Sequence, residues 1–224
     1  LVTNGLGGYA SGTISGVATR RYHGLLIAAL PSPLGRMMMF NHLVEQIRFP
    51  DGEVLQLGGE ERTDQGPEMP GAQYLSVFRL ETGLPVWRYE VKGIVLEKRL
   101  HLLHLQNTVH ITYRLVSGAS PVQLVLRPLV YFRAHEGLVS EPLQGPYALT
   151  IIDDRYEIAS SPALPPLRLM LYEEKPALTV AGDLVKNIFY RLEASRGYEA
   201  QGVLWSPGYF TSELSPGQSA TLVA

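Results

Sequence analysis

The 224-residue sequence contains no cysteine and no long apolar segment. Disulfide bonds and thiolate chemistry are therefore excluded, and the absence of cysteine is typical of a reducing compartment. The longest apolar runs fall far short of the ~20 residues that a membrane-spanning helix needs. No basic segment followed by an apolar stretch marks a signal peptide. These absences predict a cytoplasmic protein without a membrane partner.

Charge is also scarce, since charged residues make up only 18% of the chain and the formal net charge is −2. A chain with this balance produces no broad electric field that would attract nucleic acid or anionic lipid. We therefore expect no nucleic-acid partner, and we expect a ligand that is neutral or small. The hydrophobic content of 46% is that of a globular protein long enough to form one large domain.

Uninterrupted stretches that favour helices are rare, because 22 glycines and 16 prolines divide the chain. The longest interval without either runs from 94 to 117 and alternates with a period of two. Ile94, Leu96 and Leu100 share one parity, and the apolar residues from 109 to 115 repeat the pattern after Gln106 and Asn107. This alternation predicts two half-buried antiparallel strands joined by a tight turn.

A second hairpin is predicted from 43 to 57. Its strands, 43–49 and 53–57, flank Pro50-Asp51-Gly52, in which proline presets φ and glycine permits a tight turn. Further short strands are predicted at 25–30, 122–130, 147–152, 156–159, 167–172, 188–194, 201–205 and 220–224. Many short strands at roughly regular spacing predict an all-β fold, a large antiparallel β-sandwich with few or no helices.

Two segments leave a helical alternative open. Met37, Phe40, Val44 and Ile47 follow one another at spacings of three, four and three residues, which also suits the apolar face of a helix. One helical turn also fits between 173 and 186. The polar segment 58–71 is predicted to be a loop. None of these alternatives changes the predicted fold class.

The most distinctive segment runs from 4 to 30 and carries five glycines, at 5, 7, 8, 12 and 16. Glycines permit positive φ and close backbone approach. A polar cluster, Arg20-Arg21-Tyr22-His23, follows them, and the apolar run 25–30 is then typical of a buried strand. A polar, glycine-rich loop is thus attached directly to the core, an arrangement in which a rigid scaffold presents residues to a ligand.

This segment resembles the N-terminal domain of the bacterial and archaeal type of glycogen debranching enzyme. The resemblance rests on the pattern Asn-Gly-x-Gly-Gly-Tyr-Ala-Ser-Gly-Thr from residue 4 and on Thr-Arg-x-Tyr-His-Gly-Leu-Leu from residue 19. Weaker similar stretches begin at 107, 126, 196 and 204, so the resemblance covers nearly the whole chain. The sequence departs from the family pattern at Arg133-Ala134-His135-Glu136, where an Arg-Asp-Tyr-His-like stretch is expected.

The resemblance implies that residues 1–224 form a single β-supersandwich domain of galactose-mutarotase-like shape. In such enzymes an (α/α)6 barrel with the catalytic carboxylates follows, and this sequence does not include one. Because the sequence begins at Leu1 without an initiator methionine, we expect it to be the N-terminal part of a longer enzyme. The implied activity of that enzyme is hydrolysis of α-1,6 branch linkages in glycogen or related α-glucans. The implied partners are the α-glucan and the catalytic barrel.

The candidate substrate-binding residues come mainly from the glycine-rich loop. They are Asn4, Gly7, Gly8, Tyr9, Arg20, Arg21, Tyr22 and His23, together with Arg133 and Trp205. Aromatic rings suit the C–H faces of pyranose rings, while loop amides and guanidinium groups bind hydroxyl groups. Trp205 is expected near a strand end, at the rim of the site. The competing hypothesis is that the cluster around His23 only pins the loop by hydrogen bonds.

Catalysis within this chain has little support in the sequence. Glycoside hydrolysis usually needs two carboxyl groups on either side of the glycosidic bond. Glu60-Glu61, Asp153-Asp154 and Glu173-Glu174 are adjacent pairs, and adjacent side chains on a strand face apart. We interpret these pairs as solvated charge and predict no catalytic residue in this chain.

Cofactor chemistry is equally weakly indicated. His101 and His104 differ by an odd number, so on a strand they point to opposite faces and cannot share a metal. The spacing Gly5-x-Gly7-x-x-Ala10 imitates a dinucleotide fingerprint but lacks the strand that must precede it. We therefore expect neither a metal nor an organic cofactor.

Three functional hypotheses follow from the sequence. The first is a non-catalytic, α-glucan-contacting domain of a glycogen debranching enzyme. The second is an enzyme, in which the domain itself carries 4-α-glucanotransferase or sugar mutarotase activity. The third is a pure carbohydrate-binding or structural module. Turnover by the isolated domain would favour the second hypothesis, and glucan binding without any link to catalysis would favour the third.

Overall fold

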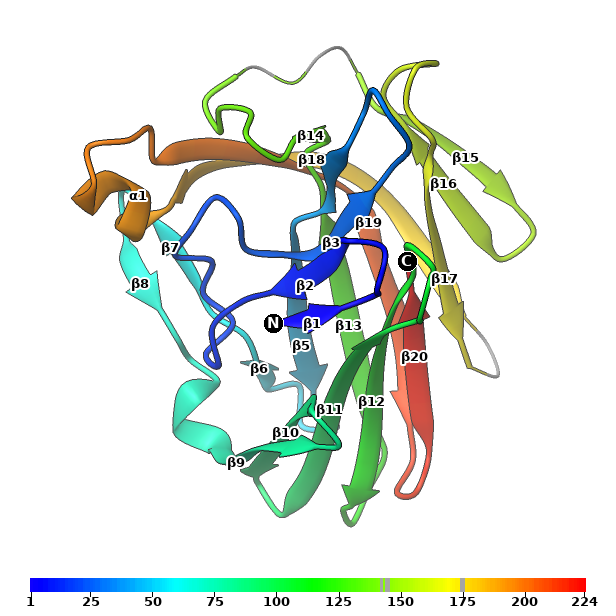
Figure 1. The fold of residues 1–224 in the computed structure, drawn as a ribbon. Coiled ribbons are helices and arrows are strands. Elements are labelled where there is room, and N and C mark those ends of the chain that lie inside the picture. Colours follow the sequence, from blue (N-terminus) through cyan, green and yellow to red (C-terminus); the bar gives the residue numbers. More distant parts are fainter. Residues whose placement is uncertain (142, 144–145, 174–175) are drawn as a thin grey trace.

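The computed structural model describes residues 1–141, 143, 146–173 and 176–224, and these residues form three antiparallel sheets (Figure 1). Helical structure in this part of the chain is confined to α1 (Arg191–Ser195) and the 3₁₀ turn η1 (Ala72–Tyr74). Neither element is long and apolar enough to cross a membrane. The predicted all-β antiparallel fold is therefore confirmed.

The three sheets draw their strands from distant parts of the chain. The five-stranded sheet contains, in spatial order, β1 (Val2–Thr3), β2 (Tyr9–Ser11), β3 (Gly24–Ala29), β4 (Arg36–Phe40) and β14 (Arg133–Ala134). The eight-stranded sheet contains β15 (Ala148–Ile152), β16 (Arg155–Ala159), β17 (Leu167–Tyr172), β20 (Ser219–Val223), β12 (Val109–Ser117), β11 (Ile94–Leu102), β10 (Leu84–Val91) and β9 (Leu75–Glu81). The seven-stranded sheet contains β6 (Val54–Gln56), β5 (His42–Arg48), β13 (Val122–Leu129), β19 (Gln201–Leu214), β18 (Ala177–Phe189), β7 (Glu60–Arg62) and β8 (Gly66–Glu68).

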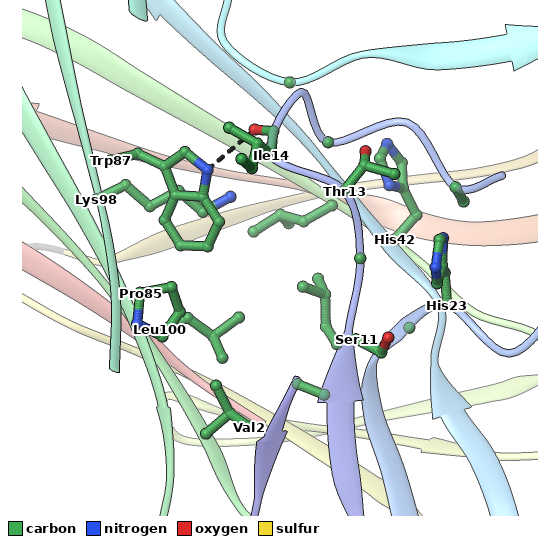
Figure 2. A pocket seen from close by; sticks show the side chains of 18 of the residues that line it. Val2, Ser11, Thr13, Ile14, His23, His42, Pro85, Trp87, Lys98 and Leu100 are labelled. Atoms are coloured by element: carbon green, nitrogen blue, oxygen red, sulfur yellow. Dashed lines mark hydrogen bonds between the residues drawn. The ribbon is translucent and has the colours of Figure 1, made fainter. Parts of the chain in front are cut away.

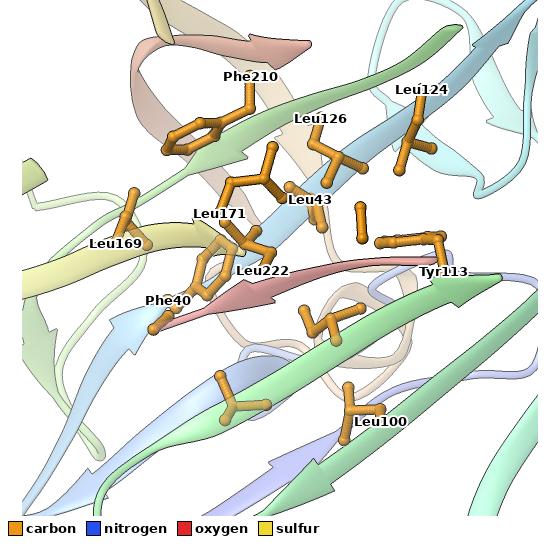
Figure 3. Packing of buried hydrophobic residues seen from close by; sticks show 14 of the residues in the cluster. Phe40, Leu43, Leu100, Tyr113, Leu124, Leu126, Leu169, Leu171, Phe210 and Leu222 are labelled. Atoms are coloured by element: carbon orange, nitrogen blue, oxygen red, sulfur yellow. The ribbon is translucent and has the colours of Figure 1, made fainter. Parts of the chain in front are cut away.

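The eight- and seven-stranded sheets pack face to face and enclose the main core (Figure 3). Ile111 and Tyr113 of β12 are fully buried, as the period of two predicts, and they share this core with Leu124 of β13. The ring of Tyr156 in β16 lies 5.2 Å from that of Phe210 in β19, edge to face, across the two sheets. Burial of each such side chain stabilises the fold by roughly 1.5–3 kcal/mol.

Both hairpins predicted from the sequence are confirmed. Strand β11 pairs with β12 in a register that places His101 opposite His110, but the six residues 103–108 connect them where a tight turn was expected. Strand β5 pairs with β6, with Ile47 opposite Leu55, around the predicted Pro50-Asp51-Gly52 turn. The helical alternative for 37–47 is excluded, because β4 and β5 occupy this segment as extended strands.

Three local expectations were wrong or incomplete. The segment 188–194 is not one strand: β18 ends at Phe189, and α1 follows, in which Glu193 is buried. The helical turn expected within 173–186 is absent from 177–186, which lie in β18, while 174 and 175 lie outside the described residues. The loop expected at 58–71 contains the β7–β8 hairpin. Pairing with neighbouring strands, which local sequence does not reveal, decided the second and third cases. In the first case the helix-forming residues 191–194 end the strand.

Side-chain amides fasten the five-stranded sheet to the main sandwich. Asn107, in the β11–β12 connection, accepts a hydrogen bond from Ala29 N (2.9 Å) and donates one to Ala29 O (2.8 Å). Its Oδ1 also accepts from Asn4 Nδ2 at 3.0 Å. The Asn107 side chain therefore makes the two backbone hydrogen bonds that a neighbouring strand would make to the end of β3. It also links the glycine-rich loop to the eight-stranded sheet.

This link predicts that Asn107→Ala destabilises the protein. The substitution leaves both backbone groups of Ala29 without their partner, so we expect a loss of about 2–3 kcal/mol in the free energy of unfolding. Urea denaturation measures this change. The matched control is Gln73→Ala, because the Gln73 amide is exposed and donates only to Pro70 O; it should change stability by less than about 0.5 kcal/mol. Equal effects of the two substitutions would contradict the role assigned to Asn107.

Candidate functional site

A groove of about 370 Å³ runs along the outer side of β1 and β2. Six of the ten candidate residues line it, namely Gly7, Gly8, Tyr9, Arg20, Tyr22 and His23. Leu1, Thr3, Ser11 and Arg36 complete the lining. The fold therefore brings the two halves of the N-terminal sequence pattern, which lie about ten residues apart in the sequence, to one surface depression.

Glycine is required where the loop turns back into β2. A Cβ atom on Gly8 would lie 2.7 Å from Asn4 Nδ2 and 2.9 Å from Ile27 O, which is too close for any other residue. Gly7 has a φ of +97°, and its carbonyl accepts a hydrogen bond of 2.7 Å from Arg36 Nε. These two glycines therefore set the shape of the groove wall rather than contribute chemistry through side chains.

Asn4 holds this turn from inside. It is fully buried, and its Oδ1 accepts hydrogen bonds of 3.0 Å from Leu6 N and from Gly8 N. Its Nδ2 donates to Gln106 O at 2.9 Å as well as to Asn107. All the hydrogen-bonding capacity of the Asn4 amide is thus used within the protein, and its side chain does not line the groove.

Four side chains, beginning with Tyr9, form a hydrogen-bonded chain beside the groove. The Tyr9 hydroxyl is 2.8 Å from His135 Nε2, and His135 Nδ1 is 2.9 Å from Glu136 Oε1. The other carboxylate oxygen of Glu136 accepts a hydrogen bond of 2.8 Å from the Tyr22 hydroxyl. The Tyr22 ring also packs against His135, with centroids 4.7 Å apart. This network fixes the two tyrosines relative to each other.

Arg21 completes the network from the side. Its Nη2 donates to the Tyr22 hydroxyl at 2.6 Å and forms an ion pair with Glu136 at 3.4 Å. The hydrogen bond from Tyr22 is the main cause that lowers the pKa of Glu136, with further contributions from His135 and Arg21. Glu136 is therefore an ionised acceptor at neutral pH, not a proton donor.

Arg133 supports the site from below without reaching the groove. It is 4% exposed, and its guanidinium donates to the carbonyl oxygens of Ala134, His135, Gly137 and Arg21. Burial lowers the pKa of Arg133. The residue ties the 134–137 segment to the loop that carries Arg21, so its position in the structure is that of a support for the network.

His23 is a neutral, half-buried residue at the junction of loop and strand. Burial first, and then the neighbouring charge of Arg20, lower the pKa of His23 to about 4. Its Nδ1 accepts a hydrogen bond of 3.2 Å from Thr19 N. Because Nδ1 is an acceptor, the neutral ring carries its proton on Nε2.

Trp205 lies away from the groove. It was expected at a strand end, but it sits inside β19, opposite Leu184 of β18. Its ring packs against Tyr147 with centroids 5.1 Å apart, and its backbone bonds to Val130. The following Ser-Pro-Gly sequence does not end the strand, because β19 continues to Leu214, and the register shift at this point lies in β18 between Val180 and Asp183.

Sequence analysis missed three residues of this site: His135, Glu136 and Arg36. His135 and Glu136 were noted only as a departure from the family pattern. They lie more than 110 residues from Tyr9 and Tyr22 in the sequence, so no local spacing connects them. The one available signal was that a histidine and an acid, His135 and Glu136, follow Arg133 after a single intervening residue, in the segment that departs from the family pattern.

The predictions about the adjacent carboxylate pairs have mixed outcomes. Asp153 and Asp154 are exposed, as solvated charge should be. Glu61 was expected to be solvated, but it is 5% exposed and Arg191 binds it with three hydrogen bonds of 2.8–3.1 Å. Glu174 lies outside the described residues. Among the residues that the structure describes, no three metal-ligating side chains come together.

The fold and the groove define an all-β domain that presents tyrosine, arginine and neutral histidine side chains on a glycine-shaped surface. A family model described as glycogen debranching enzyme N terminal matches residues 1–221. The chain therefore belongs to this family, and the resemblance noted from the sequence is confirmed. No curated protein matches the chain.

The lowered pKa of His23 predicts a pH dependence of stability. Between the unfolded pKa of ~6.5 and the folded pKa of about 4, only the unfolded state binds the proton, so stability falls as pH falls through this window. His23→Asn preserves a hydrogen-bond acceptor but does not titrate. After allowance for partial exposure, we expect the variant to gain about 1 kcal/mol relative to wild type between pH 7 and about pH 5.

Urea unfolding at the two pH values measures this difference. The carboxylates titrate in both proteins, so their contribution cancels in the comparison. A constant stability difference at both pH values would show that His23 is accessible to protons in the folded state.

Proposed function

We propose that this chain is a non-catalytic, α-glucan-contacting domain of a glycogen debranching enzyme, and that the groove holds part of the glucan. The observation that carries the proposal is the lining of the groove by residues of both halves of the N-terminal pattern. We place the enzyme in the cytoplasm, which is the compartment of the proposed glucan substrate. The absence of cysteine is compatible with this reducing compartment.

The chemistry of the groove suits a neutral, hydroxyl-rich ligand. Tyr9 and Tyr22 supply aromatic surface held in place by His135 and Glu136. Arg20 supplies donors, and its Nε is buried without a hydrogen-bond partner in the described structure. Sugar rings combine C–H faces with hydroxyl groups, so a site of this kind matches both of their surfaces.

The absence of carboxyl groups from the groove lining, all of which is described, favours binding over catalysis. Glycosidases usually place two carboxyl groups across the scissile bond, one of them protonated. Glu136 approaches the groove only through Tyr22 and His135, and its pKa is lowered. The enzymatic alternatives, glucanotransferase or mutarotase activity within this chain, therefore lack an acid and base pair at this site.

We further propose that the groove adjoins the catalytic barrel of the same enzyme. Ligand sites occur preferentially at domain interfaces. A rigid loop at such an interface adds hydroxyl contacts and excludes water from the neighbouring pocket. Under the remaining alternative, a pure binding or structural module, the groove would bind glucan without any effect on catalysis.

Replacing Arg20 should weaken glucan binding. Arg20→Ala removes a charged donor from the groove, and we expect the Kd for a branched dextrin to rise about tenfold, equivalent to about 1.4 kcal/mol. Isothermal titration calorimetry with the 224-residue chain measures the affinity. The control is Arg48→Ala, because Arg48 is exposed at the end of β5 and does not line the groove. If both variants bind as tightly as wild type, the groove is not the glucan site.

The isolated chain should not hydrolyse α-1,6-branched dextrins or transfer maltosyl units. The physical reason is the lack of a carboxyl pair in the groove. Release of reducing sugar and chromatography of the products measure hydrolysis and transfer. Turnover that disappears when a single Asp or Glu of this chain is replaced would establish the enzymatic alternative instead.

A further inference from the structure

A separate cavity of about 200 Å³ lies between the N-terminal strands and the β9–β11 end of the eight-stranded sheet (Figure 2). Its volume equals that of about seven water molecules at ~30 Å³ each, and it is smaller than the ~300 Å³ at which pockets for drug-sized ligands begin. A cavity of this size suits a single six-membered ring with its substituents.

One side of the cavity is apolar and carries an indole ring. Val2, Pro85 and Leu100 line it, and Trp87 stands beside them (Figure 2). The Trp87 Nε1 donates a hydrogen bond of 2.9 Å to Ile14 O, which fastens the loop after β2 across the cavity. An aromatic and aliphatic wall of this kind packs against an apolar ring face.

A charged pair forms part of the lining without giving it a net charge. Lys98 in β11 and Glu45 in β5 lie on the faces of these strands that otherwise carry apolar, core-facing side chains. Their side chains, 11% and 3% exposed, form an ion pair of 2.5 Å, and the Tyr113 hydroxyl also binds Glu45. The ammonium of Lys98 lies 5.1 Å from the Trp87 ring centroid. Because the two charges compensate each other, a charged ligand gains nothing here.

The opposite side offers neutral hydrogen-bonding groups. Ser11, His23 and His42 line it, and Figure 2 shows the two imidazole rings on this side. Burial lowers the pKa of both histidines, so each ring is neutral at pH 7. A neutral imidazole offers one donor and one acceptor, and Nε2 of His23 remains a donor because Nδ1 already accepts from Thr19.

We propose that this cavity is a second ligand site, which binds one neutral, polyhydroxylated six-membered ring of the hexopyranose type. The apolar wall with Trp87 receives the C–H face of the ring, and Ser11, His23 and His42 bind its hydroxyl groups. The site does not depend on glucan binding in the groove, although Leu1, Ser11 and His23 line both.

Tryptophan fluorescence tests the proposal directly. The chain has two tryptophans, so Trp205→Phe leaves Trp87 as the only reporter. In this background we would titrate D-glucose, and also cyclohexanol and D-glucuronate as an apolar and a charged ring of similar size. Circular dichroism and thermal unfolding of each variant would establish that it is folded.

We expect glucose to produce a saturable fluorescence change with a Kd of about 1 mM. Val2→Phe should weaken this binding at least tenfold, because the larger side chain occupies the cavity. His42→Leu should weaken it by up to about tenfold through loss of a hydrogen-bonding group. The matched control is Arg20→Ala, which alters the groove but not the cavity lining and should leave the glucose response unchanged.

Three results would overturn the proposal. The first is the absence of a saturable change up to about 100 mM glucose, which is a hundredfold above the expected Kd. The second is binding of cyclohexanol or glucuronate as tight as that of glucose, because the hydroxyl-binding wall or the neutrality of the site would then play no part. The third is a response that Arg20→Ala abolishes and that both folded cavity variants retain, which would assign the glucose to the groove.

Discussion

The hydrogen bonds of Asn107 to Ala29 and to Asn4 are the constraint on which the N-terminal part of the molecule depends. β1 and β2 are only two and three residues long, and ladders this short contribute little stability by themselves. The two asparagines fix the glycine-rich loop to the β11–β12 connection and so set the distance between the loop and the sandwich. Both the groove on the outer side and the cavity on the inner side owe their shape to this distance.

Buried charged residues hold the loops and the cavity lining in place. Arg133 collects carbonyl oxygens from two segments that are more than 100 residues apart in the sequence. Lys98 and Glu45 compensate each other among apolar residues of β11 and β5 that face the core. Each charge is paired or hydrogen-bonded, as burial requires. As a result, the groove keeps an ionised acceptor behind its tyrosines, whereas the cavity remains neutral.

Most of the fold was predictable from the sequence, because its signals are local. The period of two from 94 to 117 placed β11 and β12, and the Pro-Asp-Gly turn placed β5 and β6. The errors have two sources. In 58–71 and 177–186, pairing with neighbouring strands decided the structure. In 188–194, β18 ends at Phe189 and the helix-forming residues 191–194 begin α1, where the Glu193 carboxylate accepts a hydrogen bond from Arg21 N.

The sequence by itself determined the all-β class, the family and the loop that forms the groove, because the glycines and polar residues of that loop lie close together along the chain. Tertiary structure alone brought His135 and Glu136 behind Tyr9 and Tyr22, and moved Trp205 into the middle of a strand. It also paired Lys98 with Glu45, two charged residues that lie on the otherwise apolar, core-facing sides of separate strands. Contacts across a β-sandwich join residues that are distant in sequence. The packing of the sheets therefore decides which side chains meet, and local sequence spacing does not.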